Sequence, residues 1–298
     1  MGKKNQNMKN IIITTILVIA SINLSIAGGP WPQPKGKGYF KLSEYWIVFD
    51  QHFTDAGLLD PNVTNGLFNT NFYGEYGITN QFTAIVNAPL FSRNFMNNVV
   101  SGTTGEVLIP GEAVNSIGDI DVGLKYGFKL SSYEIPVSAT LILGLPTGNS
   151  AAGTQGNLQT GDGEFNQLFQ IDAGFGFNLA PKVSSYFSAY TGFNNRTNGF
   201  SEEFRFGAEY GLGFFKNKLW INGKLNVVES FKNGKTAADI TSTSVFANNS
   251  EFSSFAVEAA VYVTKKVGFS ASYATAFRGE IIAAAPAYSV GIFVDLSK

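Results

Sequence analysis

Strict alternation of apolar and polar residues is the feature that most constrains the fold of this chain. In "IGDIDVGLKYGF", residues 117–128, apolar side chains fill every second position from Ile120 to Phe128, and aspartate, lysine or glycine stands between them. Neighbouring side chains of a β-strand point to opposite faces, so this period predicts a strand with one apolar face and one polar face. Such a strand suits a soluble β-sandwich, with the apolar face on a core, or a transmembrane barrel, with that face on lipid.

The same alternation recurs along the chain and predicts about twelve strands. Residues 165–178 and 203–215 repeat it clearly, with phenylalanine, tyrosine or alanine on one face and glycine or charged residues on the other. The predicted strands lie near residues 38–49, 67–78, 82–91, 117–130, 136–146, 165–178, 183–194, 203–215, 219–231, 252–263, 267–277 and 287–296.

The links between these strands alternate in length, and this alternation separates the two folds. Links after even-numbered predicted strands are short: 79–81, 131–135, 179–182, 216–218 and 264–266. Links after odd-numbered strands are mostly long: 50–66, 92–116, 147–164, 195–202, 232–251 and the shorter 278–286. Up-and-down barrels have short periplasmic turns and long outer loops, whereas a Greek-key sandwich has no reason to sort its links in this way. The sequence therefore predicts an all-β fold, a transmembrane up-and-down antiparallel β-barrel with both termini periplasmic.

The amino terminus has the order of a secretory signal peptide. Three lysines precede the apolar run 11–20, and Ser25-Ile26-Ala27 fits a small-residue cleavage site. An inner-membrane anchor is the alternative, but the run is shorter than the ~20 residues that a spanning helix needs. We therefore expect residues 1–27 to be a signal peptide and 38–298 an outer-membrane barrel of a Gram-negative bacterium.

Composition agrees with a barrel and excludes several functions. Charged residues make up 14% of the chain, whereas a soluble domain usually has about 25%. The chain has no cysteine, which excludes disulfides and thiolate metal sites. Removal of three lysines with residues 1–27 changes the formal charge from −1 to −4, so no basic surface for nucleic acid remains.

Two features near the start of the barrel need separate interpretations. Residues 28–37, "GGPWPQPKGK", are too rich in proline and glycine for a strand interior and predict a flexible periplasmic lead-in. The alternative is a small inner plug with Trp31 in the mouth of the barrel. Glu44 falls on the apolar face of its strand, where a lipid-facing acid is costly, so a bulge or a position at the lipid–water interface is needed.

The polar face of the strands should point into the lumen. Lys41 lies on this face, together with nine candidate lumen-lining residues: Glu75, Asp119, Asp121, Lys125, Asp172, Arg205, Glu209, Lys224 and Glu258. Mixed signs favour pairing across the lumen, because buried charges need partners. A permeation path lined by the same network is the alternative, and a strongly anion-selective pore is disfavoured. In the tight hairpin around residues 216–217, Glu209 and Lys224 should lie opposite each other and form an ion pair.

The sequence contains no motif that is typical of an enzyme active site. The only histidine, His52, lies in "DQHFTD" at the predicted start of an outer loop, with no serine beside it to act as a nucleophile. "NLQTGDGEF" is glycine-rich but lacks the lysine of a phosphate-binding loop. The scattered loop acids do not have the spacing of a calcium loop. The sequence predicts no catalytic residue, no cofactor and no metal site.

Several stretches together resemble a known family of outer-membrane barrels. The stretches are "GYFKLSEYWIVFDQHF", "EYGITNQFTAIVNAPLF", "GDIDVGLKYGF", "LILGLPTGN" and "TGDGEF". In this order they resemble the MetA-pathway of phenol degradation family, over residues 36–179. The resemblance implies an outer-membrane barrel linked to the movement of small, often aromatic, compounds. The family contributes no site residues to this chain.

Two functions therefore remain open. The first is an outer-membrane channel or facilitator for small, hydrophobic or aromatic solutes. The second is a non-conducting barrel whose long outer loops contact a partner or a surface. Either one requires outer-membrane lipid and the barrel-assembly machinery as partners, and the first adds a small-molecule solute.

Overall fold

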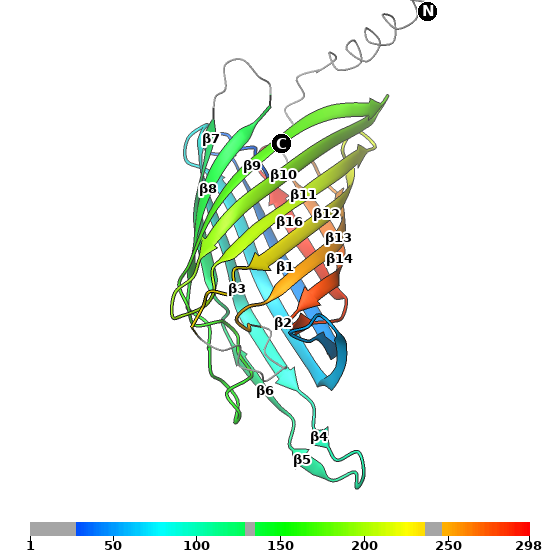
Figure 1. The fold of residues 1–298 in the computed structure, drawn as a ribbon. Helices are drawn as coiled ribbons and strands as arrows, with labels where there is room; N and C mark the ends of the chain where they lie inside the picture. Colours follow the sequence, from blue (N-terminus) through cyan, green and yellow to red (C-terminus); the bar gives the residue numbers. More distant parts are fainter. Residues whose placement is uncertain (1–27, 129–134, 236–245) are drawn as a thin grey trace, which may run out of the picture.

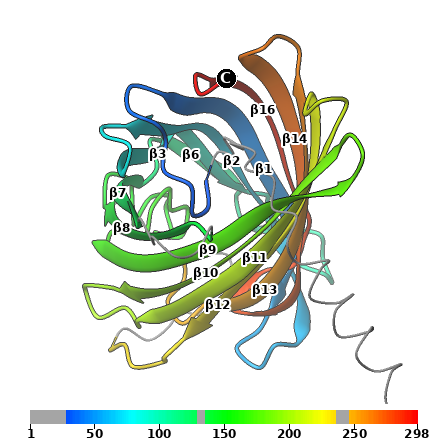
Figure 2. The ribbon, with the colours of Figure 1, turned by 90° about the horizontal axis from the view of Figure 1, so that it is seen from above.

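A ring of twelve long antiparallel strands forms the wall of the protein in the computed structural model, which describes residues 28–128, 135–235 and 246–298 (Figures 1 and 2). Each strand pairs with its neighbours in the chain, and β1 pairs with both β2 and β16, which closes the sheet without a free edge. The wall strands are β1 (Gly38–Phe53), β2 (Leu59–Gly77), β3 (Phe82–Met96), β7 (Ile120–Phe128), β8 (Val137–Leu145), β9 (Asn166–Ala180), β10 (Val183–Asn195), β11 (Glu203–Phe214), β12 (Leu219–Ser230), β13 (Glu251–Tyr262), β14 (Val267–Glu280) and β16 (Ala287–Asp295).

These strands match the twelve predicted segments, and the predicted fold class is confirmed. The main difference concerns the first hairpin. β1 and β2 continue beyond the predicted ends, so the predicted link 50–66 shrinks to residues 54–58. His52 lies in β1 opposite Asp60 and Ala283, and its assignment to an outer loop is therefore wrong. The outer part of this hairpin is polar and does not alternate, so the sequence pattern predicted strands that end too early.

Four short strands extend the end of the barrel that has the long loops. β6 (Glu112–Ser116) pairs with the outer part of β3, and β15 (Ile282–Ala283) pairs with β1. β4 (Val99–Val100) and β5 (Val107–Ile109) form a separate small hairpin that projects beyond the wall in Figure 1. The predicted link 92–116 thus contains structure of its own.

The two faces of the wall differ as the alternation predicts. On the outer face, Leu124 and Phe169 are 45% and 52% exposed, although both are large and apolar. On the inner face, Lys125 is 3% exposed. A sandwich would reverse this arrangement, because its apolar face packs against a second sheet. An apolar belt around a closed sheet is suited to lipid, in which every backbone amide must be paired.

Glu44 lies on the outer face, as its position in the alternation requires. Its Oε2 accepts a hydrogen bond at 2.8 Å from the hydroxyl of Thr70, which lies directly opposite on β2. The strand pairing is regular at this point, so the register shift in this hairpin, between Phe49 and Gln51, does not explain the acid. A cross-strand hydroxyl partner lowers the cost of an acid on this face.

The described chain starts and ends at the same end of the barrel, the end with the short turns. Gly36 donates a backbone hydrogen bond to Gly77 at the end of β2, and Leu296 donates one to Gly38 at the start of β1. The proposed signal peptide, residues 1–27, lies outside the described residues. Within the described residues, no helix is both long and apolar enough to cross a membrane.

Candidate lumen site

Residues 28–33 lie inside the short-turn end of the barrel, and the exposed residues 34–37 lead from them to β1 (Figure 2). Pro30 is fully buried, and Trp31 meets Tyr186 of β10 edge-on with 5.7 Å between ring centroids. The backbone N–H of Gln33 donates to the Thr83 hydroxyl at 2.8 Å. These contacts contradict the flexible lead-in for residues 28–33, and the alternative, an inner plug with Trp31 in the barrel mouth, describes them; residues 34–37 are exposed. We refer to residues 28–37 as the plug.

Glycines in the wall make room for the plug. A Cβ added to Gly127 of β7 would lie 2.6 Å from Cγ of Pro32, and one added to Gly77 would lie 2.1 Å from the carbonyl oxygen of Pro34. Both distances are shorter than any normal contact, so a side chain at either position would displace the plug. These two inward-facing glycines of the alternating pattern thus allow the plug to approach the wall closely.

A buried carboxylate anchors the plug to the wall. Glu75 of β2 is fully buried and accepts hydrogen bonds from Nε2 of Gln33 at 2.9 Å and from the hydroxyl of Tyr73 at 2.6 Å. Nζ of Lys125, on β7, lies 3.4 Å from the same carboxylate. The backbone N–H of Gly28 donates to Glu75 as well. A buried charge with several donors is far less costly than an unpaired one.

Glu75 and Lys125 belong to a cavity of about 300 Å³ that also includes Asp121 and Asp172, and we call it the acidic chamber. Asp121 accepts a hydrogen bond from Nδ2 of Asn87 at 3.1 Å. Asp172 is 4% exposed, and its Oδ1 accepts one from Nε2 of Gln170 at 2.8 Å. Its Oδ2 accepts no hydrogen bond from any residue that the structure describes.

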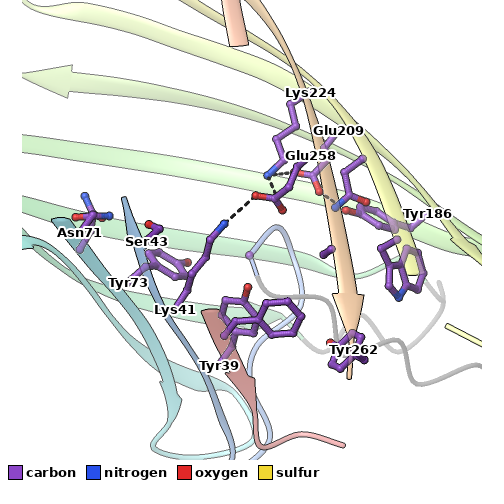
Figure 3. Close-up of a pocket in the computed structure, with 16 residues that line it drawn as sticks. Tyr39, Lys41, Ser43, Asn71, Tyr73, Tyr186, Glu209, Lys224, Glu258 and Tyr262 are labelled. Carbon is purple, nitrogen blue, oxygen red and sulfur yellow. Dashed lines mark hydrogen bonds and ion pairs between the residues drawn. The ribbon is translucent and has the colours of Figure 1, made fainter. Parts of the chain in front are cut away.

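A second cavity, of about 350 Å³, is lined by Lys41, Glu209, Lys224 and Glu258, and we call it the paired chamber (Figure 3). Nζ of Lys41 lies 2.9 Å from Glu258. Nζ of Lys224 lies 3.5 Å from Glu209 and 3.9 Å from Glu258. Glu209 also accepts a hydrogen bond from the Tyr186 hydroxyl. The predicted ion pair between Glu209 and Lys224 is confirmed, and the two residues face each other in the register of β11 and β12.

The start of the plug lies where the two chambers adjoin. Gly28 lines both of them, as do Tyr73 and Asn87. Tyr186 and Trp220 lie on the paired side, where their rings are 5.7 Å apart. The two cavities are therefore adjoining parts of one lumen, with a glycine backbone at their boundary.

Arg205 lies apart from both chambers, near the long-loop end of β11. Its Nη2 lies 2.5 Å from the Glu203 carboxylate. Arg196, after β10, shares that carboxylate at 2.8 Å and also pairs with Glu164 and with Asp162. Arg196 thus joins the loop before β9 to the hairpin of β10 and β11, and Arg205 is connected to this cluster through Glu203.

Asp119 also holds a loop and lines neither chamber. It stands just before β7, and its two carboxylate oxygens accept backbone N–H bonds from Gly148 and Asp162, each at 2.8 Å. Burial raises the pKa of Asp119 to about 6, although these two N–H donors act to lower it. The carboxylate thus joins two segments of the long link between β8 and β9.

Sequence reasoning missed several residues of this site. Tyr73 shares the parity of Glu75 on one strand, so the alternation could have placed it in the lumen. Gln33 and Arg196 lie in segments without any period, and no pattern marks them. Among the described residues, no group of three or more histidines or acids is arranged to hold a metal ion.

Comparisons with solved structures identify the architecture. The COG4313 outer membrane channel from Pseudomonas putida F1 superposes with a TM-score of 0.55, at 16% identity, over 90% of this chain and 98% of that one. This chain has the fold of an outer-membrane β-barrel. Weaker matches include the β domain of the Bordetella autotransporter BrkA, with a TM-score of 0.48, 12% identity, and 88% and 100% coverage. The NanC porin gives 0.46, 8% identity, and 86% and 100% coverage.

At these identities the likeness extends to the fold alone. No family model matches the chain, and no curated protein sequence does. Membership in the MetA-pathway of phenol degradation family therefore stays a prediction.

Proposed function

We propose that this protein is an outer-membrane channel for small solutes, with a lumen narrowed by residues 28–37. One observation supports this most: two adjoining chambers, of about 350 and 300 Å³ and both lined by Gly28, remain open inside the barrel. A barrel with a purely structural interior would fill this space with side chains.

The chemical character of the residues that line the chambers indicates which class of solute they favour. Family resemblance alone suggests hydrophobic or aromatic compounds. Charged groups, amides and tyrosine hydroxyls line both chambers, and such walls favour small polar solutes. We therefore place polar solutes first, and aromatic ones remain compatible with the tyrosines of the paired chamber.

Single-channel recording in planar bilayers tests the proposal. Discrete conductance steps are expected from the purified barrel, and their absence at every voltage and salt concentration tried would refute a channel. The competing function is a non-conducting barrel that binds a partner through its loops. It draws support from the projecting β4–β5 hairpin, where Val100, Val107 and Leu108 are each at least half exposed.

The channel proposal includes an orientation: removal of the signal peptide after Ala27, insertion by the barrel-assembly machinery, and short turns in the periplasm. Single cysteines introduced at Asn98 and Asn217 test this orientation, because the chain has no cysteine of its own. Asn98 follows β3 at the long-loop end, and Asn217 lies in the turn between β11 and β12. An impermeant maleimide applied to intact cells should label the first and spare the second. Equal labelling would overturn the orientation.

A further inference from the structure

The acidic chamber has more negative charge than its own cation can neutralise. Glu75, Asp121 and Asp172 face a single lysine, Lys125, so the four charged groups sum to −2. Lys125 lies against Glu75 and also attracts Asp172. Arg205, which attracts Asp121 from the loop end, is itself paired with Glu203. Buried anions in such excess favour an added cation.

Two oxygen atoms in this chamber lack a hydrogen-bond partner among the described residues. They are Oδ2 of Asp172 and Oγ1 of Thr140 on β8, whose residues are 4% and 2% exposed. Both residues line the same cavity. An unpartnered buried polar atom is costly, so each marks a position where a donor from outside the wall would be stabilised.

Apolar side chains complete the shape of the chamber. Ile85 of β3 and Ile142 of β8 line it together with the two unpartnered oxygens. An alkyl stem can lie against isoleucine, while a hydrated metal ion gains nothing there. The matching head group carries a positive charge and several N–H donors, which describes a primary ammonium with its three donors and no acceptor.

We propose that the acidic chamber binds a primary ammonium group. The group can come from two sources. A chain cleaved after Ala27 would begin at Gly28, and its new α-ammonium would stand at the boundary of the chamber, where the Gly28 nitrogen already donates to Glu75. The other source is a small alkylamine solute, an assignment that rests on the proposed channel function. Both sources bring the same head group to the acidic chamber, the first beside Glu75 and the second within reach of Asp172 and Thr140.

Binding of n-propylammonium to the purified full-length mature barrel, measured by calorimetry in detergent, tests the solute source. We expect propylammonium to bind and Asp172→Asn to weaken binding about tenfold or more, because a charge-assisted hydrogen bond is lost. Propanol lacks the charge and tetramethylammonium lacks the N–H donors, so both should bind far more weakly. Asp50→Asn, an exposed acid outside the chamber, is the matched control and should bind as the wild type does.

Acylation of the α-amino group, followed by intact mass, tests the N-terminal source. Near pH 7 a free α-amine reacts before lysine, because its ordinary pKa is about 7.7–8.0 and that of lysine is about 10.4. If the α-ammonium occupies the chamber, the wild type should resist acylation and fail to bind propylammonium. Asp172→Asn should then release the amine to react.

Two controls keep the outcome decisive. Gel mobility before and after heating shows whether each variant forms a folded barrel. Where Asp172→Asn does not fold, Thr140→Val removes the second unpartnered oxygen without a change of charge. The proposed ammonium site is overturned if propylammonium binding does not depend on Asp172 and the α-amine is not protected, even in a barrel that conducts. Ammonium binding by a barrel that never conducts would instead refute the channel and keep the chamber.

Discussion

The paired chamber and the acidic chamber share one lumen, yet they balance their charges in different ways. In the paired chamber, two lysines and two glutamates come from β1, β11, β12 and β13, and every charge has an opposite partner in the wall. In the acidic chamber, three acids meet one lysine, and Gln33 from the plug supplies part of the hydrogen bonding. In the paired chamber, the strands of the wall alone supply a partner for every charge. The acidic chamber depends on groups that come from outside the wall.

Removal of the plug should have the largest effect, because the plug occupies part of the lumen beside both chambers. Deletion of residues 28–37 from the mature chain is expected to raise single-channel conductance several-fold. The control is the double substitution Lys35→Ala and Lys37→Ala, which changes exposed residues of the plug and leaves Pro30 and Gln33 in place. Unchanged conductance after the deletion would mean that the plug does not obstruct the path taken by ions.

Loss of a single lysine should destabilise the barrel more in the acidic chamber than in the paired chamber. Lys125→Met leaves Glu75 fully buried beside Asp172 and is expected to destabilise the barrel by about 3–5 kcal/mol. Lys41→Met should cost clearly less, because Glu258 keeps Lys224 and stays partly exposed. Urea unfolding of both variants in lipid vesicles measures the difference. Equal losses would erase the distinction between the chambers.

The hairpin pair within the paired chamber should show a smaller, measurable coupling. Glu209→Gln and Lys224→Met each leave one partner unpaired, and the double variant should recover part of the loss. We expect a coupling of about 0.5–3 kcal/mol in a double-mutant cycle, towards its lower end because both side chains are partly exposed. Strictly additive losses would show that the two charges do not interact.

The contrast between the chambers also marks what the sequence could predict. Alternation places residues on a face because lipid tolerates only apolar side chains, and a tight turn sets the register of its own hairpin. Glu209 and Lys224 were therefore predictable. The contact between Lys41 and Glu258 joins residues 217 positions apart, and it depends on how far the strands shear when the barrel closes. Alternation does not determine that shear.

The plug lay beyond prediction for a different reason. Residues 28–37 have no period, so no pattern could say whether they remain outside the barrel or fold into it. Their position follows from shape and partners: glycines at Gly77 and Gly127 that leave space, and the Glu75 carboxylate that accepts from Gln33. The same limit applies to the extended β1–β2 hairpin, where polar residues on both faces conceal the strand.

The smallest effect is expected from Asp119, which lies outside both chambers and gives a reference for a carboxylate held by backbone N–H groups. Burial raises its pKa to about 6 in the folded protein, above the ordinary value of 3.8. Between these values the folded state binds more protons than the unfolded state, so this group makes stability fall as pH rises from about 4 to 6. Above pH 6 the unfavourable contribution is complete and constant.

Asp119→Asn removes this titration and keeps an acceptor for one of the two N–H donors. Urea midpoints of the wild type and the variant, compared at pH 4.5 and pH 7.5, isolate the contribution, because all other acids titrate in both. The stability of the variant relative to that of the wild type should increase as pH rises. The increase should be modest because Asp119 is only half-buried. Asp50→Asn, at an exposed position, should show no such trend. If the variant instead became more stable relative to the wild type as pH falls, the two N–H donors would outweigh the effect of burial on the pKa of Asp119. Asp119 would then stabilise the loops as an anion.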